Sequence, residues 1–210
     1  MGEEKRKEYE RLVGEISACT RCPLHATRKK PVPGEGPLDA DVMVVGEAPG
    51  RREDETGRPF VGPAGRLLDA LLVKAGLERG GVYITNVVKC RPPGNRDPTR
   101  EEIAACLPYL RRQIRIIRPR VIIALGRHAG RTLYELAGRR WRGMKAEHGV
   151  PLEVEIEGVR LTLVATYHPA AALYNPQVRR SLEEDFSNII ANIVHGRGSK
   201  SGRRSLLDFM

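Results

Sequence analysis

The apolar run at residues 42–45, Val-Met-Val-Val, contains no polar residue and stops abruptly at the turn 46–50, Gly-Glu-Ala-Pro-Gly. Four apolar residues without polar alternation are typical of a strand that is buried on both faces, as strands of a parallel sheet are. Ligands of such sheets bind where the strands end. The turn is therefore expected to place the Glu47 carboxylate in a crevice.

Two other strand-like runs also end in polar residues. Residues 82–85 end at Asn86, and residues 161–165 lead to His168. In a parallel sheet the carboxyl ends of the strands lie at one edge, where a crevice forms. We therefore expect Glu47, Asn86 and His168 to converge on one pocket.

Apolar periodicity and the Gly and Pro signals divide the chain into alternating strands and helices. Helices are expected at residues 4–17, 65–75, 98–117, from 126 onward and at 181–194, and the hairpin 150–156 and 160–166 follows the strand at 121–125. This alternation favours an α/β fold of three layers, α/β/α, with a central, mostly parallel four-stranded sheet.

The chain has 210 residues, which suits one well-buried α/β domain. We expect a single domain over residues 1–195 and a flexible, basic tail over 196–210. The first residues lack the apolar core of a signal peptide, and no run approaches the roughly 18 apolar residues of a membrane span. We therefore expect a soluble, intracellular monomer with no membrane partner.

The chain is strongly basic. Lys and Arg number 36 against 26 Asp and Glu, which gives a formal net charge of +10. Of these cations 28 are Arg, whose planar guanidinium binds phosphate oxygens in pairs. The balance favours a polyanionic partner such as nucleic acid. A high-GC genome or growth at high temperature, as in a thermophile, would also raise the Arg content.

The four cysteines comprise one C-x2-C pair, Cys19 and Cys22, and two separated residues, Cys90 and Cys106. Disulfides are rare inside cells, so metal binding or plain burial remains. Four thiolates can hold zinc or an iron-sulfur cluster, and the spacing does not choose between them. Cys106, among Ala and Leu residues on an expected helix, also fits an ordinary core position.

The side chains at the expected pocket suit a flat base. The Asn86 amide offers a donor and an acceptor that match O4 and N3–H of uracil, whereas cytosine reverses both. Phe60, in a loop after Glu47, could stack on an extruded base, and His168 could stabilise an anion. Each also has an ordinary alternative: Asn86 closing a turn, Phe60 packing on the core and His168 making a local hydrogen bond.

Five short motifs follow one another along the chain: GEAPG at 46–50, Glu-Asp at 53–54, GRPFVG at 57–62, TNVVKCRPP at 85–93 and HPA at 168–170. Together they resemble the family 4 uracil-DNA glycosylases over residues 19–192. The resemblance implies a monofunctional enzyme of base excision repair that flips uracil out of single- or double-stranded DNA and hydrolyses its N-glycosidic bond, leaving an abasic site. It also implies a cytoplasmic, prokaryotic enzyme whose four cysteines hold a 4Fe-4S cluster.

The same resemblance implies a role for each matching residue. Glu47 would lie near the glycosidic bond and its water, Phe60 under the uracil ring, Asn86 on its O4 and N3 edge, and His168 at O2. Glu47 and His168 are then the catalytic residues.

Two further residues of the first turn, Gly46 and Ala48, are expected to contact the substrate. Better-known relatives carry Asp where this chain has Ala48. Glu47 is therefore expected to orient water and stabilise charge rather than act as a strong base.

Base flipping requires a wedge and a grip on the DNA backbone. Leu173 is a candidate wedge, with packing on a helix as the alternative. Four arginines are candidates for binding phosphates: Arg91, Arg127, Arg179 and Arg180.

The last residues, 203–210, resemble a degenerate sliding-clamp-binding peptide with Leu206, Phe209 and Met210 at its hydrophobic positions. Arg203 stands where glutamine is usual, and a frayed terminus with chance hydrophobic residues is the alternative.

Two functions of other classes remain open on the sequence: a non-catalytic uracil-DNA binding protein and an iron-sulfur electron-transfer protein. A nucleotide-binding enzyme is disfavoured, because residues 46–50 form neither a dinucleotide fingerprint nor a P-loop.

Overall fold

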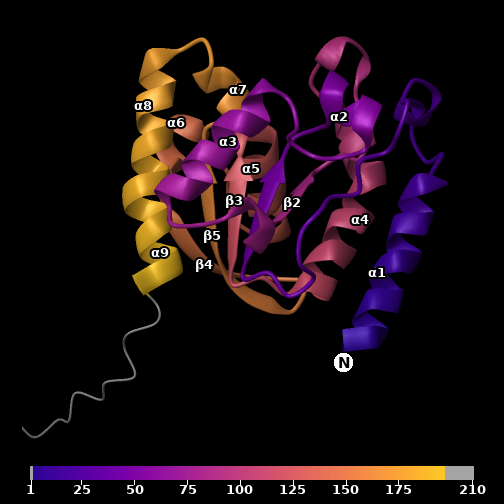
Figure 1. Cartoon of the computed structure of the whole chain (residues 1–210), viewed down its shortest axis with the longest axis horizontal. Helices are drawn as coiled ribbons and strands as arrows, with labels where there is room; N and C mark the ends of the chain where they lie inside the picture. The colour runs from indigo at the N-terminus through magenta and orange to yellow at the C-terminus, as the bar shows by residue number, and fades with distance from the viewer. Residues whose placement is uncertain (1, 197–210) are drawn as a thin grey trace, which may run out of the picture.

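The structure, a computed structural model, describes residues 2–196. The predicted basic tail beyond Gly196 and the predicted clamp-binding residues Leu206, Phe209 and Met210 lie outside the described residues. Within them, a central sheet lies between two layers of helices (Figure 1).

The sheet has five strands in the order β2-β1-β3-β5-β4. Their bounds are β1 Val42–Gly46, β2 Tyr83–Asn86, β3 Val121–Leu125, β4 Pro151–Ile156 and β5 Val159–Thr166. Strands β2, β1, β3 and β5 run parallel, and β4 runs antiparallel to β5. The predicted three-layer α/β class is confirmed, whereas the predicted number of four strands is wrong.

The fifth strand is β4, which forms a hairpin with β5. Glu157 and Gly158 both adopt positive φ, 54° and 71°, as two-residue hairpin turns that match strand twist require. Val154 and Ile156 of β4 are buried on the core side. β4 therefore completes the sheet as an antiparallel edge strand.

The helices cover both faces of the sheet. Their bounds are α1 Gly2–Ser17, α2 Arg51–Thr56, α3 Pro63–Lys74, α4 Arg100–Ile117, α5 Gly126–Leu136, α6 Met144–Glu147, α7 Pro169–Ala172, α8 Pro176–Glu184 and α9 Ala191–Gly196, with a π-helical segment at Asp185–Ile190 and short 3-10 turns at Pro23–Ala26, Arg79–Gly81 and Pro93–Asn95. The predicted helix at 181–194 thus begins earlier, because Asn175 Oδ1 accepts the N–H groups of Gln177 and Val178 and caps α8 at its first turn.

Alternate residues of the buried strands face the two layers. Met43 and Val45 of β1 lie in one core with side chains of α1, α4 and α5. Val42 and Val44 lie in the other core with side chains of α3, α8 and the π-helical segment. Burial on both faces explains the absence of polar residues from the run at 42–45.

The four parallel strands end at the same edge of the sheet. Gly46 of β1 is the register partner of Asn86 of β2, and Leu125 of β3 is the partner of Thr166 of β5. Four of the predicted residues lie at or directly after these ends: Glu47, Asn86, Arg127 and His168. No helix among residues 2–196 combines the length and apolar character needed to cross a membrane.

Candidate active site

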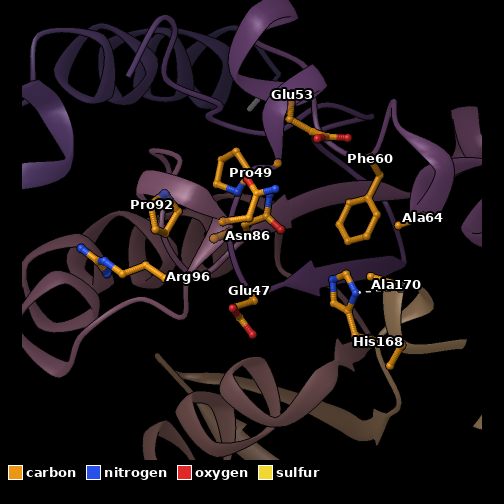
Figure 2. Close-up of a pocket in the computed structure, with 14 residues that line it drawn as sticks. Glu47, Pro49, Glu53, Phe60, Ala64, Asn86, Pro92, Arg96, His168 and Ala170 are labelled. Atoms are coloured by element: carbon orange, nitrogen blue, oxygen red, sulfur yellow. Dashed lines mark hydrogen bonds between the residues drawn. The ribbon is translucent and has the colours of Figure 1, made fainter. Parts of the chain in front are cut away.

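A cavity of about 370 Å³ opens at the carboxyl ends of the parallel strands. Five of the predicted residues are among those that line it: Glu47, Ala48, Pro49, Gly50, Glu53, Phe60, Ala64, Asn86, Pro92, Asn95, Arg96, His168, Ala170 and Ala171. Figure 2 shows Asn86, Phe60 and His168 around the same space, with Glu47 at its side. The predicted convergence of Glu47, Asn86 and His168 on one pocket is therefore confirmed.

Asn86 is the last residue of β2 and is only 1% exposed. Within the described residues, its Oδ1 is the buried side-chain oxygen that has no hydrogen-bond partner. A buried acceptor without a donor is costly, and native proteins keep few of them. The Asn86 amide, on the cavity wall, thus offers an unsatisfied acceptor to a ligand.

Gly46 lies directly behind this amide. A Cβ atom at Gly46 would lie 2.4 Å from Asn86 Oδ1 and 2.6 Å from the Phe60 ring. The predicted residue Gly46 therefore does not line the cavity itself but allows the two side chains that do so to approach the β1 backbone.

Phe60 both lines the cavity and packs on the core beside α3, so the two roles considered for it coexist. Its backbone has φ of +50°, a left-handed conformation that is unusual for an aromatic residue. Glu53 Oε1 accepts the N–H groups of Val61 and Gly62 at 2.8 and 2.9 Å. On the other side, Arg79 Nη1 donates to the carbonyl of Phe60 at 3.1 Å. These contacts hold the strained loop in place.

His168 lies at the start of α7, on the opposite wall from Asn86 (Figure 2). Its Nδ1 accepts the N–H of Ala170 at 3.1 Å, so the proton of the neutral ring sits on Nε2. Burial lowers the pKa of His168 to about 4, so the ring is neutral at neutral pH. Its ring lies nearly parallel to that of Phe60, with 5.6 Å between the centroids. The site therefore presents a neutral Nε2–H donor.

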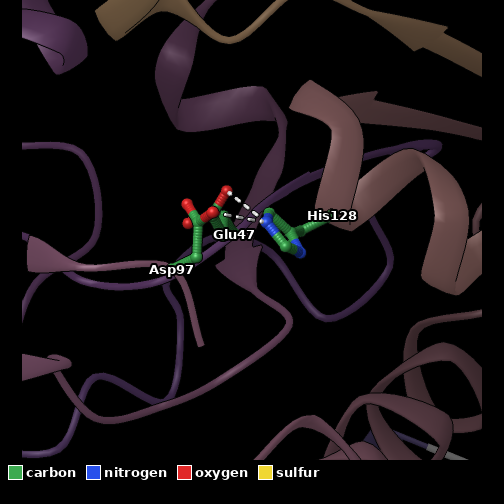
Figure 3. Close-up of side chains that lie close together, drawn as sticks. All are labelled: Glu47, Asp97 and His128. Atoms are coloured by element: carbon green, nitrogen blue, oxygen red, sulfur yellow. Dashed lines mark ion pairs between the residues drawn. The ribbon is translucent and has the colours of Figure 1, made fainter. Parts of the chain in front are cut away.

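Glu47 belongs to a group of ionisable side chains, with Asp97 and His128, shown in Figure 3. His128 Nε2 lies 4.0 Å from Glu47 Oε2 and 3.4 Å from Asp97 Oδ2, and Arg127 also pairs with Asp97. Burial raises the pKa of Glu47, His128 opposes this rise, Asp97 adds to it, and Arg127 opposes it. The charge of Glu47 thus depends on Arg127 and His128 of α5 and on Asp97 in the loop before α4.

These side chains also form a set of possible metal ligands. Glu47, Asp97 and His128 offer ligand atoms that all lie within 4.8 Å of one another. The Arg127 guanidinium donates to His128 Nε2 at 3.2 Å and pairs with Asp97. The Arg127 guanidinium therefore already contacts two of the three possible metal ligands, His128 and Asp97.

Four contributors to this site have no assigned role in the sequence analysis: Glu53, Arg79, Asp97 and His128. Glu53 falls within one of the five short motifs, and His128 follows β3 much as Glu47 follows β1. The sequence positions of these two residues could therefore have indicated a role at the cavity. Arg79 lies in a short 3-10 turn and Asp97 in a loop, and neither segment has a local pattern that points to the cavity.

The four predicted metal-ligating cysteines line a second, smaller cavity: Cys19, Cys22, Cys90 and Cys106. All four are free thiols, so the described residues contain no disulfide. Cys19 and Cys22 follow α1, Cys90 follows β2 and Cys106 lies on α4, so the fold brings them together from distant parts of the sequence. Cys106 is buried, as the core alternative requires, but it faces the other three.

The surroundings of these cysteines suit anionic sulfur. Arg28 Nη1 donates to Cys90 Sγ at 3.1 Å, and the backbone N–H of Lys89 donates to Cys106 Sγ at 3.2 Å. Burial raises the pKa of Cys106 to about 11, so a thiolate there requires a nearby cation. A metal centre with four thiolate ligands fits this donor set.

The predicted wedge lies beyond the cavity wall. Leu173 follows α7 and is 37% exposed, while the next residue, Tyr174, is 90% exposed. Ala171, two residues before Leu173, lines the cavity. Two exposed hydrophobic side chains therefore stand next to its rim.

The four predicted phosphate-binding arginines differ in their contacts. Arg127 pairs with Asp97, Arg179 pairs with Glu183, and Arg91 donates to the side chain of Asn95. Arg180 is exposed on α8.

Comparisons with known proteins agree with this geometry. The model of the uracil DNA glycosylase superfamily matches residues 33–192. A type-4 uracil-DNA glycosylase of Pyrobaculum aerophilum is 54% identical over 82% of this chain and 88% of its own length. One of Sulfurisphaera tokodaii is 49% identical over 86% of this chain and 82% of its own length. A type-5 uracil-DNA glycosylase of Pyrobaculum aerophilum is 36% identical over 77% of this chain and 82% of its own length.

Proposed function

The chain belongs to the uracil DNA glycosylase superfamily, and we propose that it is a monofunctional uracil-DNA glycosylase of base excision repair. It flips uracil out of single- or double-stranded DNA and hydrolyses the N-glycosidic bond, leaving an abasic site. The identity of about half to the type-4 relatives, against 36% to the type-5 relative, supports the type-4 branch.

The observation that carries this proposal is the unpartnered Oδ1 of Asn86 in the cavity wall. The N3–H of uracil supplies the donor that this oxygen lacks, while the Asn86 Nδ2 donates to O4. Cytosine offers an acceptor at N3 and an amino group at C4, so it leaves both amide groups unpaired. A site built in this way can reject the wrong base by about 10⁴-fold or more.

The catalytic step separates charge rather than requiring a strong nucleophile. As the glycosidic bond breaks, negative charge builds up on the uracil O2 and positive charge on the sugar. The neutral His168 donates from Nε2–H to O2, and Phe60 supports the base from one side. Glu47 stabilises the cationic sugar and orients the attacking water, since Ala48 offers no second carboxylate.

The type-4 assignment also supports a 4Fe-4S cluster at the four cysteines. Cys19, Cys22, Cys90 and Cys106 would ligate it, which would tie the segment after α1 to β2 and α4. The cluster takes no part in the bond cleavage proposed here, and its role is to hold the walls of the site together.

The remaining contacts concern DNA and other partners. Leu173 acts as the wedge, and the four arginines bind backbone phosphates: Arg91, Arg127, Arg179 and Arg180. We further propose a monomer with one domain over residues 1–195, a cytoplasmic prokaryotic location, and sliding-clamp binding through Leu206, Phe209 and Met210.

A uracil-release assay tests the function. The wild-type chain is expected to release uracil from single- and double-stranded oligonucleotides, and Asn86→Ala, Glu47→Gln and His168→Ala are each expected to lose at least about tenfold in kcat. Wild-type rates in all three variants would refute the assignment of these residues. Uracil-DNA binding without release would favour the non-catalytic binding protein. A reversible visible redox change without DNA binding would favour electron transfer.

A further inference from the structure

Lys89 is a buried lysine that the proposed mechanism does not use. It lies between the uracil-reading residue Asn86 and the cysteine Cys90, and it is only 1% exposed. Its Nζ donates to Asn86 O at 2.6 Å, to Thr85 Oγ1 at 2.7 Å and to Gln113 Oε1 at 2.7 Å. All three protons of the ammonium group therefore have an acceptor.

The acceptors around Lys89 are themselves fixed. Gln113 Nε2 donates to Pro33 O at 2.7 Å and to Tyr83 Oη at 3.0 Å, which sets the orientation of its amide. Thr85 Oγ1 donates to Pro33 O at 2.8 Å. Lys89 thus belongs to a buried network in which each partner is satisfied, and such networks hold a single arrangement.

This cation has no carboxylate partner within the described residues. None of the ion pairs there includes Lys89, and its three acceptors are neutral. A buried charge without an opposite charge is strongly unfavourable. Two of the proposed sulfur ligands, which would be thiolates in a metal centre, lie beside it: Cys90 is the next residue, and Cys106 Sγ accepts the backbone N–H of Lys89.

We propose that Lys89 is a positioning residue that couples the metal centre to uracil recognition. Its charge compensates the thiolates of Cys90 and Cys106, and the same ammonium group holds the carbonyl of Asn86, whose side chain reads the base. Gln113 and Cys106 both lie on α4, so the network also ties that helix to the end of β2. This inference rests on the proposed function.

The coupling has a direct geometric basis. Asn86 and Lys89 are three residues apart, and the hydrogen bond from Nζ to Asn86 O closes the turn that leaves β2. The carbonyl and the side chain of Asn86 share one Cα atom, so a shift of the peptide plane moves the amide against the cavity. The side chain of Asn86 has no protein partner at Oδ1 that would hold it independently.

The experiment compares Lys89→Met, whose unbranched side chain is one atom shorter and lacks the charge and all three donors, with Lys89→Arg, which keeps the charge. Lys145→Met is the matched control, because it makes the same change at an exposed lysine. Three quantities are measured on anaerobically purified protein: iron and sulfide per chain, the rate of iron release to a chelator, and the inhibition constant of free uracil. Affinity for uracil-free DNA is measured in parallel.

We expect Lys89→Met to release iron about tenfold faster than the wild-type chain. We also expect its iron-loaded fraction to bind free uracil about tenfold more weakly. Either change is the size expected from the loss of one or two charge-assisted hydrogen bonds. Lys89→Arg is expected to retain iron better than Lys89→Met, and binding of uracil-free DNA is expected to stay unchanged. Wild-type iron release, or wild-type uracil binding by the loaded fraction, would overturn the coupling.

If Lys89→Met does not fold, Gln113→Leu takes its place, because it removes one acceptor and keeps the lysine. The same two quantities must then shift in the same direction by a smaller factor, and wild-type values overturn the inference. A wild-type chain that holds no iron or releases no uracil would instead contradict the proposed function, so the two failures are distinguishable.

Discussion

Gly46 and Asn86 are partners in the parallel β1–β2 register, and the space between them is too small for a methyl group. A Cβ at Gly46 would lie 2.4 Å from Asn86 Oδ1. The strand that supports the cavity floor therefore needs glycine at its last position, where the amide that we propose reads the base lies against the backbone.

Gly46→Ala is expected to lower kcat/KM for uracil release by about 100-fold, because a displacement of about 1 Å in a positioned group costs that much. Its thermal unfolding should remain cooperative, since only the strand end is disturbed. Gly14→Ala, on the exposed face of α1 with nothing within 4 Å of the added methyl group, is the control and should keep wild-type kinetics. Wild-type kcat/KM in Gly46→Ala would show that Asn86 can move without loss.

The acid side of the pH–rate profile should report on Glu47 and not on His168. Burial raises the pKa of Glu47 above its usual value, whereas the pKa of His168 is lowered to about 4. As the pH falls, the Glu47 carboxylate is protonated first and its stabilisation of the sugar cation is lost. Single-turnover rates should therefore decline at a pH above the usual pKa of a glutamate side chain in the wild-type chain, and Glu47→Gln should flatten this decline.

Two neighbours of Glu47 should move this decline in opposite directions. His128 lowers the pKa of Glu47 and Asp97 raises it. His128→Ala should therefore shift the acid midpoint to higher pH, and Asp97→Asn should shift it to lower pH. The charged and titratable groups that face the cavity from other elements are Glu53, Arg96, Arg127 and His168, and both variants retain them. Shifts in the same direction would contradict the electrostatic account.

Added zinc tests whether Glu47, Asp97 and His128 form a metal site or act on one another only through their charges. With Arg127 already contacting His128 and Asp97, we expect micromolar zinc to leave the wild-type rate unchanged. Inhibition by zinc that disappears in His128→Ala would instead assign a cation to Glu47, Asp97 and His128.

Glu53 is expected to act through the loop that carries Phe60. Glu53→Ala removes the acceptor of the N–H groups of Val61 and Gly62, so the strained backbone of Phe60 can relax. We expect kcat/KM to fall by at least about tenfold. Glu53→Gln keeps an oxygen acceptor with the same shape and should retain most of the activity. Equal losses in both variants would point to the charge of Glu53 rather than to its hold on the loop.

The sequence predicted the groups that lie directly at strand ends, and it did not predict the groups that fix them. Asn86 and Glu47 follow buried apolar runs, and a parallel sheet brings such ends together whatever the loops do. The hydrogen bond from Arg79 to Phe60 and the contact between Asp97 and His128 join residues that are distant in the sequence. No local periodicity encodes such pairs. The number of strands was wrong although the hairpin at 150–156 and 160–166 was expected, because the hairpin pattern alone does not show that β4 joins the edge of the parallel sheet.

Tyr174 extends the predicted wedge at Leu173. Its side chain is 90% exposed beside Leu173, near the cavity rim. When uracil leaves a duplex, the flanking bases lose a stacking partner, and an aromatic ring can replace about 1–3 kcal/mol of that stacking. Tyr174→Ala should therefore slow uracil release from double-stranded DNA by about tenfold and leave the rate on single-stranded DNA almost unchanged. Val73→Ala, at another exposed hydrophobic residue on α3, is the control and should change neither rate. An equal loss on both substrates would place Tyr174 in general DNA binding, and a loss confined to Leu173→Ala would leave the wedge to Leu173 alone.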